Sequence, residues 1–265
     1  MTATNRFLRP FLALAGLGLL GILSLIPLIE GSIEQASRLP GAPPLPDAVF
    51  ALLILGQPTL LLLAAVALGV ALAEKAGLTS LILRRLRGEA IGQGADGWGR
   101  TLLLAFAFAA AVAAADLVLR GMFPASLTAL PRLDDVTPAG RMLALFYGGI
   151  TEELMMRFGL MTLLLWLGLL LTGGRGRPVL VWFAIGLTAF AFAAGHLGAV
   201  AGMQQMDNQV LIARILVLNG VLGLLFGWLY ASRSLEHAML AHAASHVTFW
   251  GMTPVLARLG QGFAG

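Results

Sequence analysis

The chain has 265 residues, of which 58% are hydrophobic and 11% are charged, and its mean hydropathy is +0.88. Because about a quarter of the residues in a soluble domain are charged, this composition excludes an ordinary soluble domain and predicts a membrane protein. The chain has no cysteine, which excludes disulfides, cysteine–zinc sites and thiol nucleophiles. The net charge of +4 comes mainly from arginines in predicted loops, which indicates membrane topology rather than nucleic-acid binding.

Apolar runs recur along the chain and predict an all-α, polytopic membrane helix bundle, with residues 1–265 as a single membrane domain. About 20 apolar residues span ~30 Å of hydrocarbon, and a helix satisfies its own backbone there. The first run is longer than the apolar region of a cleaved signal peptide, so we expect an uncleaved anchor. About seven transmembrane helices are predicted, at 10–29, 48–73, 101–119, 139–172, 179–202, 209–231 and 235–257.

The sequence leaves open whether the fourth run is one helix or two, and whether there are seven or eight helices in total. The fourth run is long enough for one tilted helix, or for two helices broken near Gly173 and Gly174. An eighth helix or a re-entrant segment is the alternative to a count of seven. Residues 30–47 are predicted to be a Pro-rich external linker, and residues 76–89 either an interfacial helix or a solvated basic loop.

The basic residues differ in number between the two sides of the predicted membrane. One set of alternate loops holds ten Lys or Arg residues and the other holds six, with most of the difference in the 74–100 loop. Cytoplasmic loops carry the excess of positive charge. The sequence therefore predicts a cytoplasmic N-terminus and, with seven spans, an external C-terminus.

The segment "ITEELMMRFG" at 150–159 places two carboxylates and an arginine in an apolar helix. An ionisable residue inside a membrane span is a functional-site hypothesis by default. Glu153 and Arg157 are four residues apart and can pair on one helical face. Glu152 points about 100° away from Glu153, so it remains available for chemistry. Taken singly, a buried Glu–Arg pair is more often a packing clamp than a catalytic group.

All four histidines lie between residues 196 and 246. His242 and His246 are four apart, a spacing that lets two imidazoles converge on one metal ion or one substrate oxygen. His196 lies in a different predicted span. A glutamate with two or three histidines from separate helices can activate water. His237 is interpreted as an interfacial residue, and Asn219 as an interhelical hydrogen-bond donor.

Three motifs, in this order, resemble those of the CPBP family of intramembrane proteases, which comprises CAAX prenyl endopeptidases and bacterial Abi or bacteriocin-processing relatives. "EELMMR" matches Glu-Glu-x-x-x-Arg, and "FAAGH" at 192–196 matches Phe-x-x-x-His. "HAASH" at 242–246 lies where His-x-x-x-Asn is expected. The resemblance covers about 150–250, and it places the core helices at 139–257.

The resemblance implies a role for each matched residue. Glu152 would be the general base that activates water, and His196 would help to position that water. His242 and His246 would stabilise the oxyanion, while Glu153 and Arg157 would support the helix. Position 246 departs from the family pattern because it is His instead of Asn.

This departure leaves two mechanisms open. An amide donates a hydrogen bond at any pH, whereas an imidazole can donate, accept or bind a metal. In the first mechanism the glutamate acts without a metal. In the second, that of a metalloprotease, Zn²⁺ would be held by His196, His242 and His246.

The resemblance implies an intramembrane endopeptidase that hydrolyses a peptide bond of a membrane-associated peptide or protein. We expect it in the bacterial inner (plasma) membrane, in contact with lipid and without a nucleic-acid partner. The alternative is a non-catalytic immunity or scaffold protein that retains the motifs for packing. A third hypothesis, a proton-coupled carrier, lacks the repeat halves of such proteins. The sequence indicates neither the substrate nor the oligomeric state.

Overall fold

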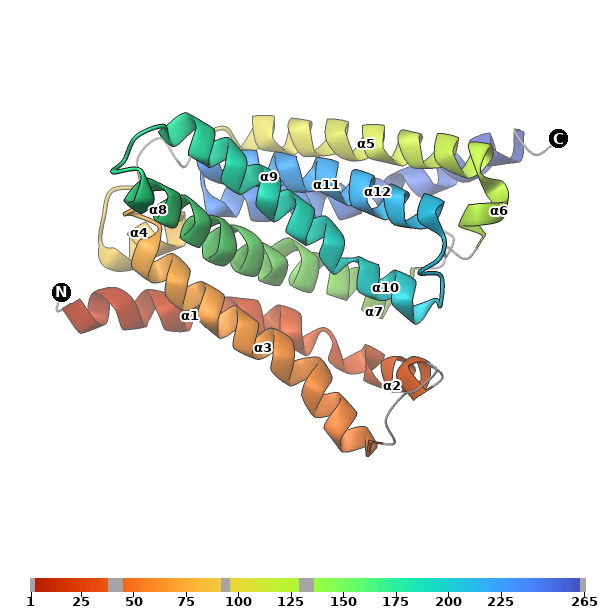
Figure 1. The fold of residues 1–265 in the computed structure, drawn as a ribbon, viewed down its shortest axis with the longest axis horizontal. Helices are drawn as coiled ribbons and strands as arrows, with labels where there is room; N and C mark the ends of the chain where they lie inside the picture. Colours follow the sequence, from red (N-terminus) through yellow and green to blue (C-terminus); the bar gives the residue numbers. More distant parts are fainter. Residues whose placement is uncertain (1–2, 38–44, 92–95, 129–135, 263–265) are drawn as a thin grey trace.

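A computed structural model describes residues 3–37, 45–91, 96–128 and 136–262. In these ranges all regular secondary structure is helical. The long helices lie side by side along the long axis of the molecule, with the N-terminus at one end (Figure 1). This architecture confirms the predicted all-α helix bundle.

The helices follow one another along the chain in three groups. The first group is α1 (Ala3–Leu23), the short η1 (Ile26–Leu28), α2 (Ile29–Ser37), α3 (Asp47–Leu72), α4 (Leu81–Arg87), α5 (Trp98–Met122) and α6 (Pro124–Leu127). The second group forms one continuous rod from α7 (Pro138–Met142), through the π-helical segments η4 (Leu143–Glu152) and η5 (Leu154–Met161), to α8 (Thr162–Leu171). The third is α9 (Arg177–Gly195), α10 (Leu197–Gly202), α11 (Gln209–Ser232) and α12 (Leu235–Gly262).

Six stretches of the described chain are long and apolar enough to cross a membrane: Thr4–Gln35, Asp47–Leu72, Trp98–Met122, Pro138–Leu171, Arg177–Gly202 and Gln209–Ser232. They coincide with the first six predicted spans. The seventh predicted span forms α12, which has 28 residues but is not one of these six. Its polar residues include Glu236 and three histidines.

Two predictions about connections are resolved by the structure. The fourth span is one rod that ends at Leu171, and Gly173 and Gly174 then turn the chain with positive φ angles of 62° and 81°. Glycine adopts this left-handed conformation without steric penalty. The prediction of a linker over 30–47 was wrong at its start, because α2 continues as a helix to Ser37. Residues 38–44 of that linker lie outside the described residues.

The rod of α7, η4, η5 and α8 lies inside the bundle, between α1 and α3 on one side and α9, α11 and α12 on the other. Helix α1 packs directly on η4: Thr151 Oγ1 donates to the Gly18 carbonyl oxygen at 2.6 Å. A Cβ on Gly21 would lie 2.6 Å from the Phe146 carbonyl oxygen, so glycine permits this close approach. The first predicted span is thus an integral part of the bundle.

The start of α12 is fixed at the end of the bundle that holds the N-terminus. The Glu236 carboxylate accepts hydrogen bonds from the backbone N–H groups of Leu81 and Ile82, at 2.9 and 3.0 Å, and so caps α4. His237 is fully buried, and its ring stacks on Trp98 with centroids 3.9 Å apart. His237 is therefore a structural residue of this end and not part of a site deeper in the bundle.

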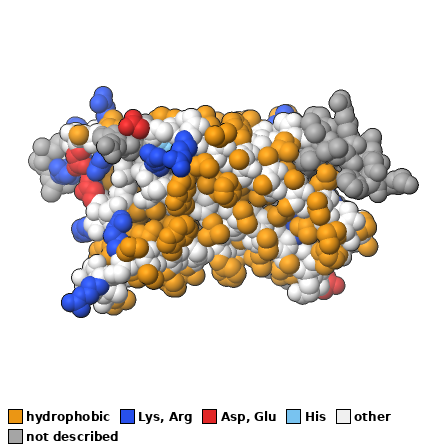
Figure 2. All heavy atoms as spheres, turned by 90° about the horizontal axis from the view of Figure 1, so that it is seen from above, with side chains coloured by type: hydrophobic (Ala, Val, Ile, Leu, Met, Phe, Trp, Pro, Cys, Tyr) orange, Lys and Arg blue, Asp and Glu red, His pale blue; other side chains and the backbone are white. Residues whose placement is uncertain are grey.

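The surface of the bundle matches a lipid environment. Hydrophobic side chains cover the middle of the molecule, and Lys and Arg gather at the end that holds the N-terminus (Figure 2). Leu60 is 71% exposed and Phe183 is 63% exposed. Large apolar patches of this kind are rare on soluble monomers, so we assign this belt to the hydrocarbon of the bilayer.

Candidate active site

The Glu-Glu-x-x-x-Arg motif lies in the part of the rod that is π-helical. Segments η4 and η5 flank Glu153, whereas the sequence predicted an ordinary α-helix there. A π-helix has i→i+5 hydrogen bonds and a wider turn, and single π turns frequently occur at functional sites. The spacing of side chains along this segment therefore differs from that of the predicted α-helix.

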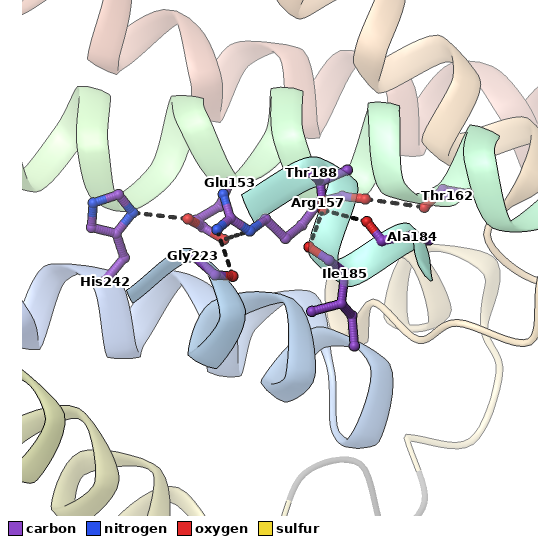
Figure 3. A network of polar contacts seen from close by, with 8 residues as sticks. All are labelled: Glu153, Arg157, Thr162, Ala184, Ile185, Thr188, Gly223 and His242. Carbon is purple, nitrogen blue, oxygen red and sulfur yellow. Dashed lines mark hydrogen bonds and ion pairs between the residues drawn. The ribbon is translucent and has the colours of Figure 1, made fainter. Parts of the chain in front are cut away.

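Glu153 and Arg157 form the predicted pair and are both fully buried. Arg157 Nε lies 3.3 Å from Glu153 Oε2, and Arg157 Nη2 donates to the Gly223 carbonyl oxygen on α11 at 3.1 Å. The other carboxylate oxygen, Glu153 Oε1, is 2.8 Å from Nδ1 of His242 on α12 (Figure 3). The pair thus ties three separate helices together.

Two phenylalanines enclose the Arg157 guanidinium. Its central carbon lies 4.8 Å from the ring centre of Phe192 and 5.5 Å from that of Phe226. Arg157 Nη1 and Nε and Glu153 Oε2 form no hydrogen bond with the described residues, so the Nε–Oε2 contact is an ion pair only. Attraction of the guanidinium to the two ring faces partly compensates for this. Phe226 also stacks on His242, with ring centroids 4.5 Å apart. Phe192, the Phe of the Phe-x-x-x-His motif, therefore packs against the buried guanidinium of Arg157.

The hydrogen bonds of His196 and His242 define how each imidazole can act. His196, just after the last residue of α9, has Nδ1 2.8 Å from the carbonyl oxygen of Phe192. A carbonyl oxygen only accepts, so His196 Nδ1 is the donor. His242 Nδ1 likewise donates to the carboxylate oxygen Oε1 of Glu153, the partner of Arg157. In the neutral imidazoles, both Nε2 atoms are then hydrogen-bond acceptors.

A cavity of about 720 Å³ brings the predicted catalytic residues together. Glu152, His196, His242 and His246 all line it: Glu152 on η4, His196 just after α9, and the other two on α12. The cavity lies in the half of the bundle away from the N-terminus, since its other walls include the start of η4 and the N-terminal half of α3. Glu153 and Arg157, the predicted supporting pair, are not among the residues that line the cavity.

Gly148 makes room for the two histidines of α12. A Cβ on Gly148 would lie 3.0 Å from His246 Nε2 and 3.4 Å from His242 Nε2. Both Nε2 atoms therefore approach the same point beside η4, and the two rings stack with centroids 5.1 Å apart. Sequence reasoning missed Gly148, although a Gly-Gly pair before two glutamates was the available signal.

The predicted zinc ligands do not fit a metal ion in this arrangement. In the part of the chain that the structure describes, no group of three or more His, Asp or Glu side chains is placed to hold one. His196, His242 and His246 share the cavity without sharing a centre of coordination. Zn²⁺ ligation by these residues stays a prediction, and no chemical step is derived through it.

For one other polar residue the prediction was wrong, and another buried polar residue was not predicted. Asn219 donates from Nδ2 to the Ile215 carbonyl oxygen of its own helix at 2.9 Å, so the interhelical interpretation was wrong, and it lines the cavity. Asp116 on α5 was missed. It is 5% exposed and binds Arg120 at 3.1 Å and Arg214 at 2.5 Å.

A known family matches the part of the chain that contains these residues. Residues 136–248 match the family model of the type II CAAX prenyl endopeptidase Rce1-like proteins. This part of the chain belongs to that family. The matched range begins before α7 and ends inside α12, so it contains all three motifs. The chain matches no curated protein and no solved structure. The predicted resemblance to the CPBP family is confirmed over this range, and the matched family is a protease family.

Proposed function

We propose that the chain is an intramembrane endopeptidase that hydrolyses a peptide bond of a membrane-associated peptide or protein. The observation that carries the proposal is the division between the two adjacent carboxylates. Glu153 is fully buried and bound to Arg157 and His242, whereas Glu152 lines the cavity. Within the described ranges, Glu152 forms no hydrogen bond or ion pair with another side chain. A carboxylate so placed can accept a proton from water.

The acceptors in the cavity suit the activation of a water molecule. One O–H of the water would donate to Glu152, and the other to Nε2 of His196. The water oxygen then attacks the carbonyl carbon of the scissile peptide while Glu152 takes its proton. The C–N bond breaks, and Glu152 returns the proton to the leaving amine. His242 and His246 on α12 line the same cavity, where they would contact the peptide.

The Glu152→Gln variant tests the role of the base. The amide keeps the shape of the side chain but cannot accept a proton, so cleavage of a peptide library in detergent should fall below detection. The thermal unfolding midpoint should stay within about 2 °C of the wild type, since Glu152 makes no ion pair that holds the fold. Glu89→Gln, at the end of the bundle away from the cavity, is the control and should remain active. Full activity in Glu152→Gln would refute the proposed mechanism.

The same preparations test the metal-dependent alternative. If the site works without a metal, His246→Asn should retain most of the activity, because an amide also donates a hydrogen bond. If the three histidines hold Zn²⁺, that variant should lose metal and activity together, because an amide is a poor zinc ligand. Elemental analysis decides between them. Stoichiometric zinc in the wild type that disappears in His246→Asn would establish the metalloprotease mechanism.

The charge distribution supports an orientation in the membrane. One set of alternate predicted loops holds ten Lys or Arg residues and the other holds six. In the described residues, Lys and Arg gather at the end that holds the N-terminus (Figure 2), so this end is assigned to the cytoplasm. The cavity occupies the opposite half of the bundle. The bond that is cleaved would then lie nearer the external leaflet, in the bacterial inner membrane that the sequence predicts.

Single cysteines test this orientation because the chain has none of its own. Arg175, between α8 and α9, and Asp207, between α10 and α11, are exposed at opposite ends of the bundle. In intact bacterial cells, a membrane-impermeant maleimide should label Asp207→Cys. Arg175→Cys should react only after the membrane is opened. The reverse pattern would place the N-terminus outside and the cavity toward the cytoplasm.

The non-catalytic alternative makes a different prediction from these tests. An immunity or scaffold protein would keep its function in Glu152→Gln, because the packing of η4 does not use that carboxylate. A wild-type chain that cleaves no member of the library, in detergent or in vesicles, would favour this alternative.

A further inference from the structure

The candidate cavity holds more fixed hydrogen-bond acceptors than donors. The Nδ1 donors of His196 and His242 are already used, by the Phe192 carbonyl oxygen and by Glu153. Their Nε2 atoms and the Glu152 carboxylate therefore face the cavity as acceptors. Attack by water on a peptide carbonyl creates an oxyanion, which needs pre-oriented donors. Another residue must supply at least one of them.

The hydroxyl of Ser245, which also lines the cavity, already donates to the Ala241 carbonyl oxygen at 2.8 Å. Four other residues of the cavity wall carry a side-chain hydrogen that could serve: Gln57, Tyr147, Asn219 and His246. Asn219 has one of its two N–H bonds committed to Ile215. Gln57 is exposed on α3, on the far side of the cavity from α9 and α12. Tyr147 is half-buried on η4, and its hydroxyl forms no hydrogen bond with the residues that the structure describes.

Unlike the other three residues, Tyr147 also lines a second pocket. A side pocket of about 200 Å³ lies between η4, η5 and α9, and it is lined by Tyr147, Glu152 and His196 together. Gln57, Asn219 and His246 do not line this pocket. Tyr147 therefore lines both the cavity and the side pocket, as do the proposed base, Glu152, and His196, which would orient the water.

The π-helix explains how Tyr147 reaches Glu152. In an α-helix, side chains five residues apart point about 140° away from one another. The i→i+5 hydrogen bonding of η4 brings such residues back toward one side. A second pair with the same spacing agrees: Gly148 and Glu153 both face α12, where they approach His242. The unusual helix thus places Tyr147 and Glu152 on one wall.

We propose that Tyr147 is a catalytic residue whose phenol O–H donates a hydrogen bond to the oxyanion of the tetrahedral intermediate. The inference rests on the proposed endopeptidase function. Tyr147 transfers no proton: the water proton goes to Glu152 and then to the leaving amine, while the phenol stabilises the negative oxygen. A neutral hydroxyl provides this donor without adding a second charge beside Glu152. With Tyr147 as a donor, stabilisation of the oxyanion depends less on position 246, which is His where the family pattern has Asn.

The chain supplies a matched control, because it has only two tyrosines. Tyr230 on α11 is fully buried, and its hydroxyl lies 2.8 Å from Thr162 Oγ1, away from the cavity wall. With a quenched-fluorescence peptide that the wild-type chain cleaves, Tyr147→Phe should lower kcat about 10²–10³-fold. KM should change little, because the hydrogen bond is strong only in the transition state. Tyr230→Phe should leave kcat unchanged.

A second measurement separates catalysis from a loss of packing. In the Tyr230→Phe background, Tyr147 is the sole tyrosine and can be replaced biosynthetically by fluorotyrosine, which keeps the ring and hydroxyl but ionises at lower pH. The alkaline limb of the kcat profile should then move to lower pH. An unchanged profile, or full activity in Tyr147→Phe, would overturn the proposal while the endopeptidase function stands. A wild-type chain that cleaves no peptide would overturn both.

Discussion

The buried pair of Glu153 and Arg157 determines how the rest of the site is arranged. Two charges without access to water are tolerated only when each is paired and hydrogen-bonded. Glu153 meets this condition with Arg157 on its own rod and His242 on α12. Arg157 meets it with Glu153, the Gly223 carbonyl oxygen and the faces of two phenylalanines. Because these partners lie on different helices, the charges fix how the rod, α9, α11 and α12 sit around the cavity.

This arrangement gives two neighbouring glutamates different properties. The pair holds Glu153 as a fixed carboxylate that orients His242, and so leaves Glu152 as the carboxylate facing the cavity. Phe192 contacts both a supporting and a reacting residue: its ring covers Arg157, and its carbonyl oxygen accepts a hydrogen bond from Nδ1 of His196. The structural and chemical residues of the motifs therefore depend on one another. Substitution of a supporting residue should disturb the position of a reacting one.

Much of this site could be predicted from the sequence, because membrane burial makes polar residues conspicuous. The apolar runs located the first six spans, and the spacing of four residues indicated the pair of Glu153 and Arg157. The polar residues in the apolar spans, together with the resemblance to the family motifs, indicated Glu152 and three histidines, and all four line one cavity. The spans and the ion pair depend on composition and local spacing, which a single sequence contains.

Other features depend on contacts between distant residues, and the sequence did not indicate them. The segment η4, which packs against α1 and α12, is π-helical, whereas the sequence of this segment by itself predicts an α-helix. Asp116 was missed because its partner Arg214 is 98 positions away. Tyr147 carried no signal, since its alignment with Glu152 follows from the π-helix. The convergence of His242 and His246 on Gly148 also required the packing of two helices.

A double-mutant cycle on Glu153 and Arg157 tests this central interaction most directly. The unfolding free energy would be measured by denaturant titration in lipid–detergent micelles for Glu153→Gln, Arg157→Met and the double variant. Arg157→Met should lose about 3–5 kcal/mol, because Glu153 is left buried without its cation. The double variant should lose about 1–3 kcal/mol less than the sum of the two single losses. Losses that add within about 0.5 kcal/mol would show that the two charges do not stabilise one another, and would contradict this account of the site.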